Sequence, residues 1–203
     1  MKRSIRIAVA AVVLLTAGAA FAAEDKSTKA AQAGLRKQLE QQTTLDASIR
    51  ALVLDSVLPL TSQAEWVKAV EDQNALNVPI NTIKAINKSW DTAEDEPASM
   101  APLRTNACAK EVAKLMQRIP NVKQVFVRDN QGASVCQNTM NKPFWYGEHD
   151  SWKAAYSEGN GGVFVEAVAL DRTANRKLQH ITLPVLGNGG KAIGAVTFGI
   201  ATG

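Results

Sequence analysis

The chain has 203 residues, of which 46% are hydrophobic, 21% charged and 5% aromatic, with 13 Gly and 2 Cys. This composition is typical of a folded globular protein and excludes collagen, extended disorder and disulfide-dense mini-proteins. The formal net charge is +4, but Lys2, Arg3 and Arg6 lie in a first segment that we expect to be removed, which leaves 20 basic against 19 acidic residues. A chain so nearly neutral does not favour a nucleic-acid partner.

Residues 1–22 are predicted to be a signal peptide. The three basic residues precede an apolar or small stretch at positions 7–20, and Ala20-Phe21-Ala22 supplies the small-x-small pattern of a cleavage site ahead of Ala23. The stretch is shorter than the ~20 residues needed to cross a bilayer, although an uncleaved membrane anchor is the alternative. We therefore expect residues 23–203 to form one exported domain, periplasmic or secreted, without a transmembrane segment.

Residues 23–119 are predicted to be mainly helical. Between residues 27 and 57 apolar side chains recur at helical spacing without any Pro, which predicts one long amphipathic helix that Pro59 ends. Ser62 stands three residues before a Glu, the spacing of a capping box, and predicts the start of a second helix. Pro79 is predicted to open a third helix.

The two cysteines are predicted to form a disulfide. On a helix over residues 102–119, Cys108 lies in the apolar stripe that faces the core. A hairpin with its turn at residues 129–132 places Cys136 opposite Val125, on the face of the sheet that this helix is expected to cover. Two buried free thiols are the alternative. No metal site is expected, because two separated Cys and two separated His offer too few ligands.

Residues 120–203 are predicted to form one five-stranded antiparallel sheet, because the hydrophobic pattern there changes from period 3.6 to period 2. Helices followed by strands indicate an α+β fold. The connection over residues 138–160 is long and aromatic, and such a connection on a rigid sheet commonly carries the function. The expected strands are 122–128, 133–137, 162–170, 178–185 and 192–200.

Several motifs resemble one known family in their order and spacing. They are Asn106-Ala107-Cys108 at a helix start, Val127-Arg128-Asp129-Asn130-Gln131-Gly132 at the hairpin turn, Phe144-Trp145-Tyr146-Gly147-Glu148, and the closing Gly194-Ala195-Val196-Thr197-Phe198-Gly199. With the long N-terminal helix, they resemble the small exported proteins that consist of a single Cache domain, the extracytoplasmic PAS-like (PDC) sensor fold. The resemblance covers nearly all of residues 23–203.

The resemblance implies a central antiparallel sheet with the long helix on one side and a ligand pocket on the other, roofed by residues 138–160. It implies an exported, non-enzymatic module that binds or senses a small molecule in extracytoplasmic signal perception. The alternative is a periplasmic adaptor that docks on a membrane sensor kinase or chemoreceptor without a ligand of its own. The segment Pro143–His149 departs from the family's pattern, so the ligands of relatives are not carried over.

Strand alternation selects candidate pocket residues without reference to the family. If the helices cover the apolar face of the sheet, Phe126 and Arg128 face the other side together with His180, Thr182 and Thr197. Such polar groups suit the few directed contacts of a mostly apolar pocket. The alternative is that this face is simply solvated, as one face of many antiparallel sheets is.

Aromatic residues of the long connection add further candidates. Trp145, Tyr146 and Trp152 are expected to contact a flat or amine ligand by cation–π interaction. Ordinary core packing is the alternative for both tryptophans. The candidate ligand contacts are therefore Trp145, Tyr146, Trp152, His180, Thr182 and Thr197.

Few charged groups are expected to set the charge of the ligand. Arg128 is expected to be satisfied by solvent or by Asp129, which leaves His180 as the basic group, and Glu148 adds a carboxylate only if it turns inward. A protonated His180 favours a neutral or weakly anionic ligand, whereas an inward Glu148 favours an amine. The chain has no Gly-x-Ser-x-Gly, HExxH or phosphate-binding loop, so neither catalysis nor a cofactor is expected.

Overall fold

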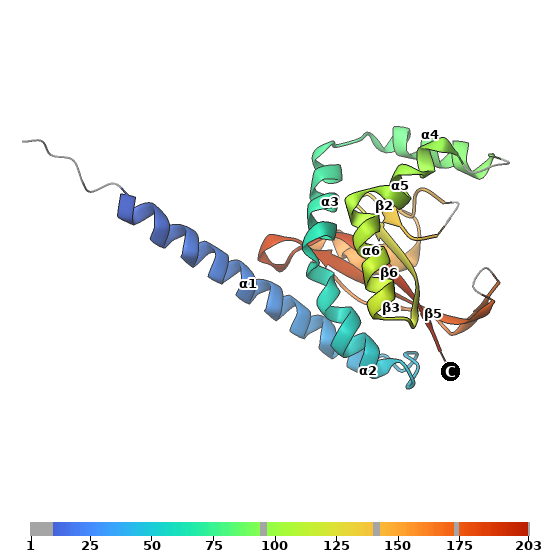
Figure 1. Ribbon diagram of the computed structural model, residues 1–203, viewed down its shortest axis with the longest axis horizontal. Coiled ribbons are helices and arrows are strands. Elements are labelled where there is room, and N and C mark those ends of the chain that lie inside the picture. The colour runs from blue at the N-terminus through green and yellow to red at the C-terminus, as the bar shows by residue number, and fades with distance from the viewer. Residues whose placement is uncertain (1–9, 94–96, 140–142, 173–174, 203) are drawn as a thin grey trace, which may run out of the picture.

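The computed structural model describes the backbone of residues 10–93, 97–139, 143–172 and 175–202, and their side chains from residue 26 onward. It has the predicted α+β architecture with one antiparallel sheet (Figure 1). The helical elements of the first half are α1 (Ala10–Gln41), α2 (Arg50–Leu52), η1 (Val53–Val57), η2 (Leu58–Ser62), α3 (Ala64–Ala75), α4 (Ile80–Asp91), η3 (Ala98–Met100), α5 (Pro102–Thr105) and α6 (Ala107–Arg118). The second half contains β1 (Val122–Arg128), β2 (Ser134–Gln137), α7 (Asp150–Tyr156), η4 (Ser157–Gly159), β3 (Phe164–Val165), β4 (Ala169–Asp171), β5 (Arg176–Leu186), η5 (Asn188–Gly190) and β6 (Ala192–Ala201).

The prediction of one helix over residues 27–57 is wrong beyond Gln41. Residues 42–49 leave the helix because side chains bind their backbone groups instead. The Asp46 carboxylate accepts hydrogen bonds from the backbone N–H and the hydroxyl of Ser48, at 2.8 and 2.6 Å. Helical turns resume at Arg50, whose guanidinium donates to the carbonyls of Leu39, Glu40, Gln42 and Leu45.

The starts of the next two helices test the predicted caps. The expected capping box at Ser62 is wrong: α3 follows Gln63 without a side-chain cap, and the Ser62 hydroxyl instead accepts a hydrogen bond from Gln32 of α1 at 3.2 Å. The third helix begins directly after Pro79, as predicted.

α1 joins the body through its C-terminal half, where Leu35 and Leu39 are buried and the helix runs beside η2 and η5. Its first turns extend away from the body (Figure 1). Residues 1–9 of the expected signal peptide, and the side chains of residues 10–25, lie outside the described residues, so the removal of this segment stays a prediction. No helix in the described part of the chain is both long and apolar enough to cross a membrane.

The strands follow the order β2-β1-β6-β5-β3, and β4 lies next to β3 along the outer edge of β5. The predicted third strand is therefore divided into β3 and β4. In the β1–β2 hairpin, Cys136 lies opposite Val127 instead of the predicted Val125. The turn is one residue longer than predicted, so Arg128 pairs with Ser134, and an irregularity between Val127 and Arg128 adds a second residue. The resulting shift of two residues keeps Cys136 on its predicted face.

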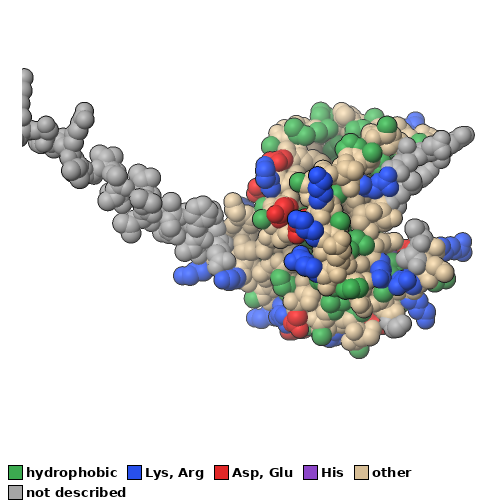
Figure 2. Space-filling view, viewed as in Figure 1, with side chains coloured by type: hydrophobic (Ala, Val, Ile, Leu, Met, Phe, Trp, Pro, Cys, Tyr) green, Lys and Arg blue, Asp and Glu red, His purple; other side chains and the backbone are tan. Residues whose placement is uncertain are grey.

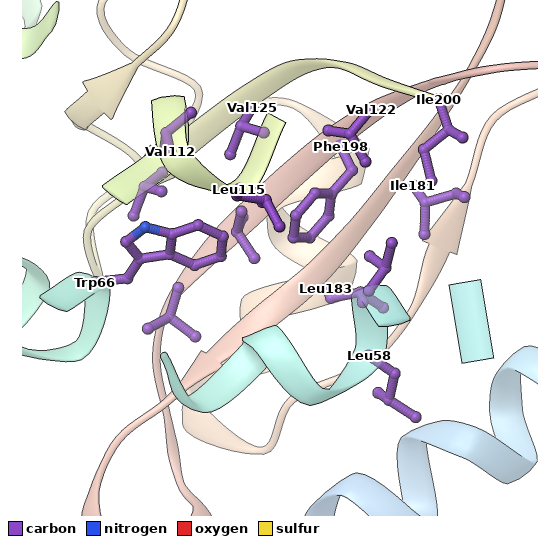
Figure 3. Packing of buried hydrophobic residues seen from close by; sticks show 14 of the residues in the cluster. Leu58, Trp66, Val112, Leu115, Val122, Val125, Ile181, Leu183, Phe198 and Ile200 are labelled. Carbon is purple, nitrogen blue, oxygen red and sulfur yellow. The ribbon is translucent and has the colours of Figure 1, made fainter. Parts of the chain in front are cut away.

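The hydrophobic core lies between the sheet and a helical layer formed by α3, α6, the end of α1 and the turns η1 and η2. Trp66 of α3 packs against Phe198 of β6 with 5.9 Å between their ring centroids. Val112 and Leu115 of α6 belong to the same buried cluster (Figure 3). Burying each large apolar side chain is worth ~1.5–3 kcal/mol. This face of the sheet is therefore used for packing, and the opposite face is left for other contacts.

The predicted disulfide is confirmed. Cys108 of α6 and Cys136 of β2 are bonded, with 5.9 Å between their Cα atoms. The bridge spans 28 residues of sequence, a constraint on the unfolded chain worth ~3–4 kcal/mol. It fastens α6 to the edge strand β2 and thereby holds the hairpin that carries Arg128.

The charged side chains are distributed over the surface of the domain. Figure 2 shows Lys and Arg side chains spread over the face in view, with acidic and hydrophobic side chains between them. Salt bridges on α3 and α6 join neighbouring charges, such as Lys68 with Asp72 at 2.8 Å and Lys114 with Glu111 at 3.0 Å. An exposed pair such as Lys68 with Asp72 contributes little to stability, typically below about 1 kcal/mol, whereas Glu111 is buried.

Candidate functional site

A cavity of about 340 Å³ lies on the face of the sheet opposite the core. Its floor consists of residues that alternate with core residues along β1, β5 and β6, and its walls come from the long connection and from the β3–β4 edge. α7, part of that connection, lies behind the sheet in Figure 1. The volume is at the small end of the range of ligand pockets. The lining residues are Gln124, Phe126, Arg128, Thr139, Tyr146, His149, Ser151, Glu166, Asp171, His180 and Thr197.

Arg128 is the central charged group of this cavity. Only 3% of the residue is exposed. Its guanidinium carbon lies 3.6 Å from the ring centroid of Tyr146 and 5.4 Å from that of Phe126, both cation–π contacts. Burial lowers the pKa of Arg128 to about 10, although Tyr146 and Glu166 partly offset this effect. The side chain therefore remains a cation at neutral pH, held between two aromatic rings.

Two threonines lie beneath the guanidinium. Arg128 Nη1 donates a hydrogen bond to Thr197 Oγ1 at 3.1 Å, and the hydroxyls of Thr197 and Thr182 are 3.0 Å apart. Thr182 pairs with Thr197 across β5 and β6 and is 1% exposed. Thr197 thus lines the cavity and positions Arg128, whereas Thr182 supports Thr197 from below.

A chain of hydrogen bonds crosses the cavity beside these residues. Gln124 Nε2 donates to Asp171 Oδ2 at 3.0 Å, so Gln124 Oε1 is available to accept from His180 Nε2 at 2.8 Å. This network places the proton of a neutral His180 on Nε2 and turns Nδ1 toward Glu166 Oε2, 3.5 Å away. A protonated His180 donates at both nitrogens and is flanked by two carboxylates through the network.

The cavity therefore has a cationic end and an anionic end. Arg128 presents its charge from β1, and Glu166 and Asp171 present carboxylates from the β3–β4 edge. Opposite charges at the two ends of a small cavity suit a ligand that carries an acidic group and a hydrogen-bond donor or cation.

The predicted ligand contacts are distributed over three places. Tyr146, His180 and Thr197 line the cavity together. Trp145 does not: its indole Nε1 donates to the Gln131 carbonyl at 2.7 Å, and Lys84 Nζ lies 4.7 Å from its ring centroid.

Trp152 lines a second cavity, of about 550 Å³, together with Tyr156 and Gly147. Its Nε1 donates to the Asp129 carbonyl at 3.1 Å, and its ring stacks on Tyr156 with 5.1 Å between centroids. The aromatic residues of the connection therefore do not form a single box.

Glu148 does not turn into the cavity, so the condition for its contributing a carboxylate there is not met: its side chain is 69% exposed and pairs with Lys153 Nζ at 3.1 Å. The expectation that solvent or Asp129 satisfies Arg128 is wrong. Asp129 does not pair with Arg128, because its carboxylate accepts hydrogen bonds from Gln73 Nε2 and from the backbone N–H groups of Gln131 and Ala133. Burial raises the pKa of Asp129, and these hydrogen bonds lower it in part.

Six polar residues that line the cavity were not predicted from the sequence: Gln124, Thr139, His149, Ser151, Glu166 and Asp171. Strand alternation could have predicted Gln124, because it lies two residues before Phe126 on the same strand and therefore shares its face. It could not have predicted Glu166 and Asp171, because the chain is interrupted between β3 and β4 and side chains do not alternate regularly across that interruption. In the described ranges, no three His, Cys, Asp or Glu residues lie close enough together to hold a metal ion.

Comparisons with known proteins find likeness in structure only. No protein-family model and no curated protein match the chain. The chain is similar to the sensor domain of the V. cholerae histidine kinase DctB, with 12% identity and a TM-score of 0.43, over 85% of this chain and 57% of that chain.

Two chemoreceptor domains give similar results. The ligand-binding domain of Campylobacter jejuni Tlp3, in complex with 4-methylisoleucine, has 14% identity and a TM-score of 0.36, over 86% of this chain and 60% of that chain. That of Pseudomonas aeruginosa PctC, in complex with GABA, has 12% identity and a TM-score of 0.35, over 68% of this chain and 58% of that chain. The chain thus spans less than two thirds of the length of each of these domains.

Proposed function

We propose that this protein is an exported, non-enzymatic module that binds a small amphoteric acid and thereby senses it in the periplasm or outside the cell. Arg128 carries the proposal. It is a buried cation at a cavity. It donates to a threonine hydroxyl, is hydrogen-bonded to the Tyr146 side chain and contacts two aromatic rings; Glu166 acts on it electrostatically, but no carboxylate among the described residues lies within salt-bridge distance of it. A buried guanidinium is costly without an anion, because it has lost its hydration. A carboxylate of the ligand would supply the missing anion.

The other end of the cavity supports the second half of the proposed ligand. Glu166 and the His180–Gln124–Asp171 network present acceptors there. An ammonium group of the ligand can donate to Glu166 while its carboxylate faces Arg128. The small volume limits such a ligand to the size of a simple metabolite.

A non-enzymatic role fits the hydroxyl groups around the cavity. Thr197 is hydrogen-bonded to Arg128 and Thr182, and within the described ranges Ser151 is hydrogen-bonded to neither a histidine nor a carboxylate. A nucleophilic hydroxyl needs such a base within hydrogen-bond reach. The hydroxyl groups of Thr197 and Ser151 are therefore suited to binding a ligand and not to attacking it.

One observation favours the second candidate, an adaptor that docks on a membrane sensor kinase or chemoreceptor without a ligand. The Tyr146 ring already lies over the guanidinium at 3.6 Å. The cationic end of the cavity is then partly filled by the protein itself. If no ligand enters the cavity, a receptor partner would bind a surface of this protein that does not change with a ligand.

A thermal-shift screen of amino acids, ω-amino acids, monocarboxylates and amines tests the proposal. A ligand at a hundredfold excess over its Kd stabilises the native state by ~2.7 kcal/mol, so the Tm rises. We expect amphoteric acids to raise the Tm and Arg128→Gln to remove the effect. Arg118→Gln, at an exposed arginine on α6, is the matched control and keeps it. If no compound raises the Tm and a membrane receptor co-purifies, the adaptor hypothesis is correct and the proposal of a ligand-binding module is wrong.

A further inference from the structure

The second cavity, about 550 Å³, is lined by other residues of α7 and shares no lining residue with the first. Trp152, Lys153, Tyr156, Glu158 and Asn160 contribute side chains to it. Neither the cationic nor the anionic end of the first cavity takes part. Its chemistry must therefore be considered by itself.

Its apolar surface is a pair of aromatic rings held in place. Trp152 and Tyr156 are one helical turn apart on α7, and their rings stack with 5.1 Å between centroids and 23° between planes. The indole N–H of Trp152 is fixed by the Asp129 carbonyl. Both residues are half-buried, so part of each side chain remains accessible beside the cavity. The rings offer a stacking surface that need not rearrange to accept a flat ligand.

The backbone that ends α7 is strained next to these rings. Ser157 and Glu158 are consecutive non-glycine residues with φ of 46° and 52° and ψ of 49° and 34°. Left-handed backbone is unfavourable for residues with a Cβ, and such positions occur preferentially at ligand sites. Asn160 Nδ2 donates to the Ser157 carbonyl at 3.0 Å and supports this turn. The strained turn places the Glu158 side chain at the cavity.

The charges around the cavity leave one carboxylate available. Lys153 Nζ is engaged by Glu148 Oε2 at 3.1 Å. Glu158 is exposed and makes no ion pair with any described residue. Aromatic faces attract cations, and a carboxylate beside them adds to that attraction. The groups that are free to act on a ligand thus favour positive charge and a flat shape.

We propose that this cavity is a second binding site, for a small flat organic cation of the aromatic amine or amidine type. The cation stacks on the Trp152–Tyr156 pair and directs its N–H groups to the Glu158 carboxylate. This proposal does not rest on the amphoteric acid proposed for the first cavity, because the two cavities share no lining residue.

Calorimetric titration of the full chain with benzamidine tests this site. Benzamide, which is neutral, and benzoate, which is anionic, have the same flat shape. We expect benzamidine to bind saturably at millimolar concentration and the other two compounds to bind more weakly. Loss of one exposed charge pair weakens binding by at most about fivefold, so Glu158→Gln is expected to raise the Kd of benzamidine by about two- to fivefold. Glu71→Gln, an exposed glutamate on α3, is the matched control and leaves the Kd unchanged.

Further variants separate this site from the first cavity. Tyr156→Leu removes half of the stacking surface and is expected to weaken benzamidine binding, with circular dichroism confirming the fold. Glu166→Gln alters only the first cavity and is expected to leave the Kd unchanged. The proposal is overturned if benzoate or benzamide binds as tightly as benzamidine, if no binding is measured, or if Glu166→Gln weakens binding while Glu158→Gln does not.

Discussion

The guanidinium carbon of Arg128 lies 3.6 Å from the ring centroid of Tyr146, so a tyrosine of the long connection covers the buried cation of the sheet. This contact joins strand β1 to the long connection over residues 138–160, and the sequence pattern does not predict that the two meet. β1 brings the charge, and the connection brings the ring that shields it. Their geometry therefore bears on the stability of this region and on the anion binding that we propose for it.

Arg128→Met is expected to stabilise the free protein while it removes ligand binding. Burial lowers the pKa of Arg128 to about 10, so the cation is disfavoured in the folded state relative to the unfolded chain. Below that pH both states are charged and folding bears this cost, which an apolar side chain of similar length avoids. Urea unfolding at neutral pH is expected to show a gain of about 1 kcal/mol. A loss of stability of that size would show that the cation is well satisfied in the free protein.

Glu166→Gln is expected to weaken the binding of an amphoteric acid, because the ammonium group loses its anion. A hydrogen bond to a charged group is worth about 1.5–3 kcal/mol, so affinity falls by about tenfold or more. Glu148→Gln is the control, since that carboxylate is exposed and paired with Lys153. Titration calorimetry with the best compound of the thermal-shift screen distinguishes the two. Equal losses in both variants would place the ammonium group elsewhere.

Asp129→Asn is expected to change the pH dependence of stability. Burial raises the pKa of Asp129 above its usual 3.8. An acid whose folded pKa is raised contributes most below the unfolded pKa, and this contribution is lost as the pH rises through the folded value. Relative to Asp129→Asn, the wild type should therefore lose free energy of unfolding as the pH rises above 3.8. Urea unfolding at several pH values checks this, and parallel curves for the two proteins would contradict it.

Gly132→Ala is expected to destabilise the fold and disturb the cavity. Gly132 has φ of +84°, and a Cβ there would lie 2.5 Å from the backbone nitrogen of Gly147. Its carbonyl also accepts the N–H of Tyr146 at 2.8 Å. The loss should exceed about 1 kcal/mol and weaken ligand binding, because Tyr146 is displaced from Arg128.

Gly34→Ala is the matched control for that substitution. Gly34 lies in the exposed part of α1, and a Cβ there meets nothing within 4 Å. Helix propensity alone then predicts a gain of roughly 0.5–1 kcal/mol. Thermal unfolding of both variants separates the effect of close packing from the effect of a lost glycine.

Periodicity predicted the sheet and much of its cavity face. Arg128, His180 and Thr197 were placed on one face by alternation, and the two-residue error in the hairpin register did not move them. Cys108 and Cys136 were paired for the same reason, since both faced the core. Patterns of this kind are reliable wherever an element is regular and one side of it is buried.

The end of α1 and the position of Glu166 depend on hydrogen bonds and strand interruptions that hydrophobic periodicity does not reveal. Residues 42–49 leave the helix because Asp46 and Arg50 bind the backbone there, and Gln179 of β5 completes the turn by donating to the Thr44 carbonyl. The position of Glu166 follows from a break between two short strands. Neither is visible in local hydrophobic spacing.

Adjacent residues of one wall face different cavities: Tyr146 lines the first and Gly147 the second, and Ser151 lines the first and Trp152 the second. A ligand that shifts α7 in either cavity therefore moves side chains in the other. Thermodynamic linkage makes such an effect reciprocal, so the factor by which one ligand changes the affinity for the other is the same in both directions. With both proposed sites occupied, the wall would allow one domain to respond to the joint presence of an acid and a cation, as a detector of coincidence.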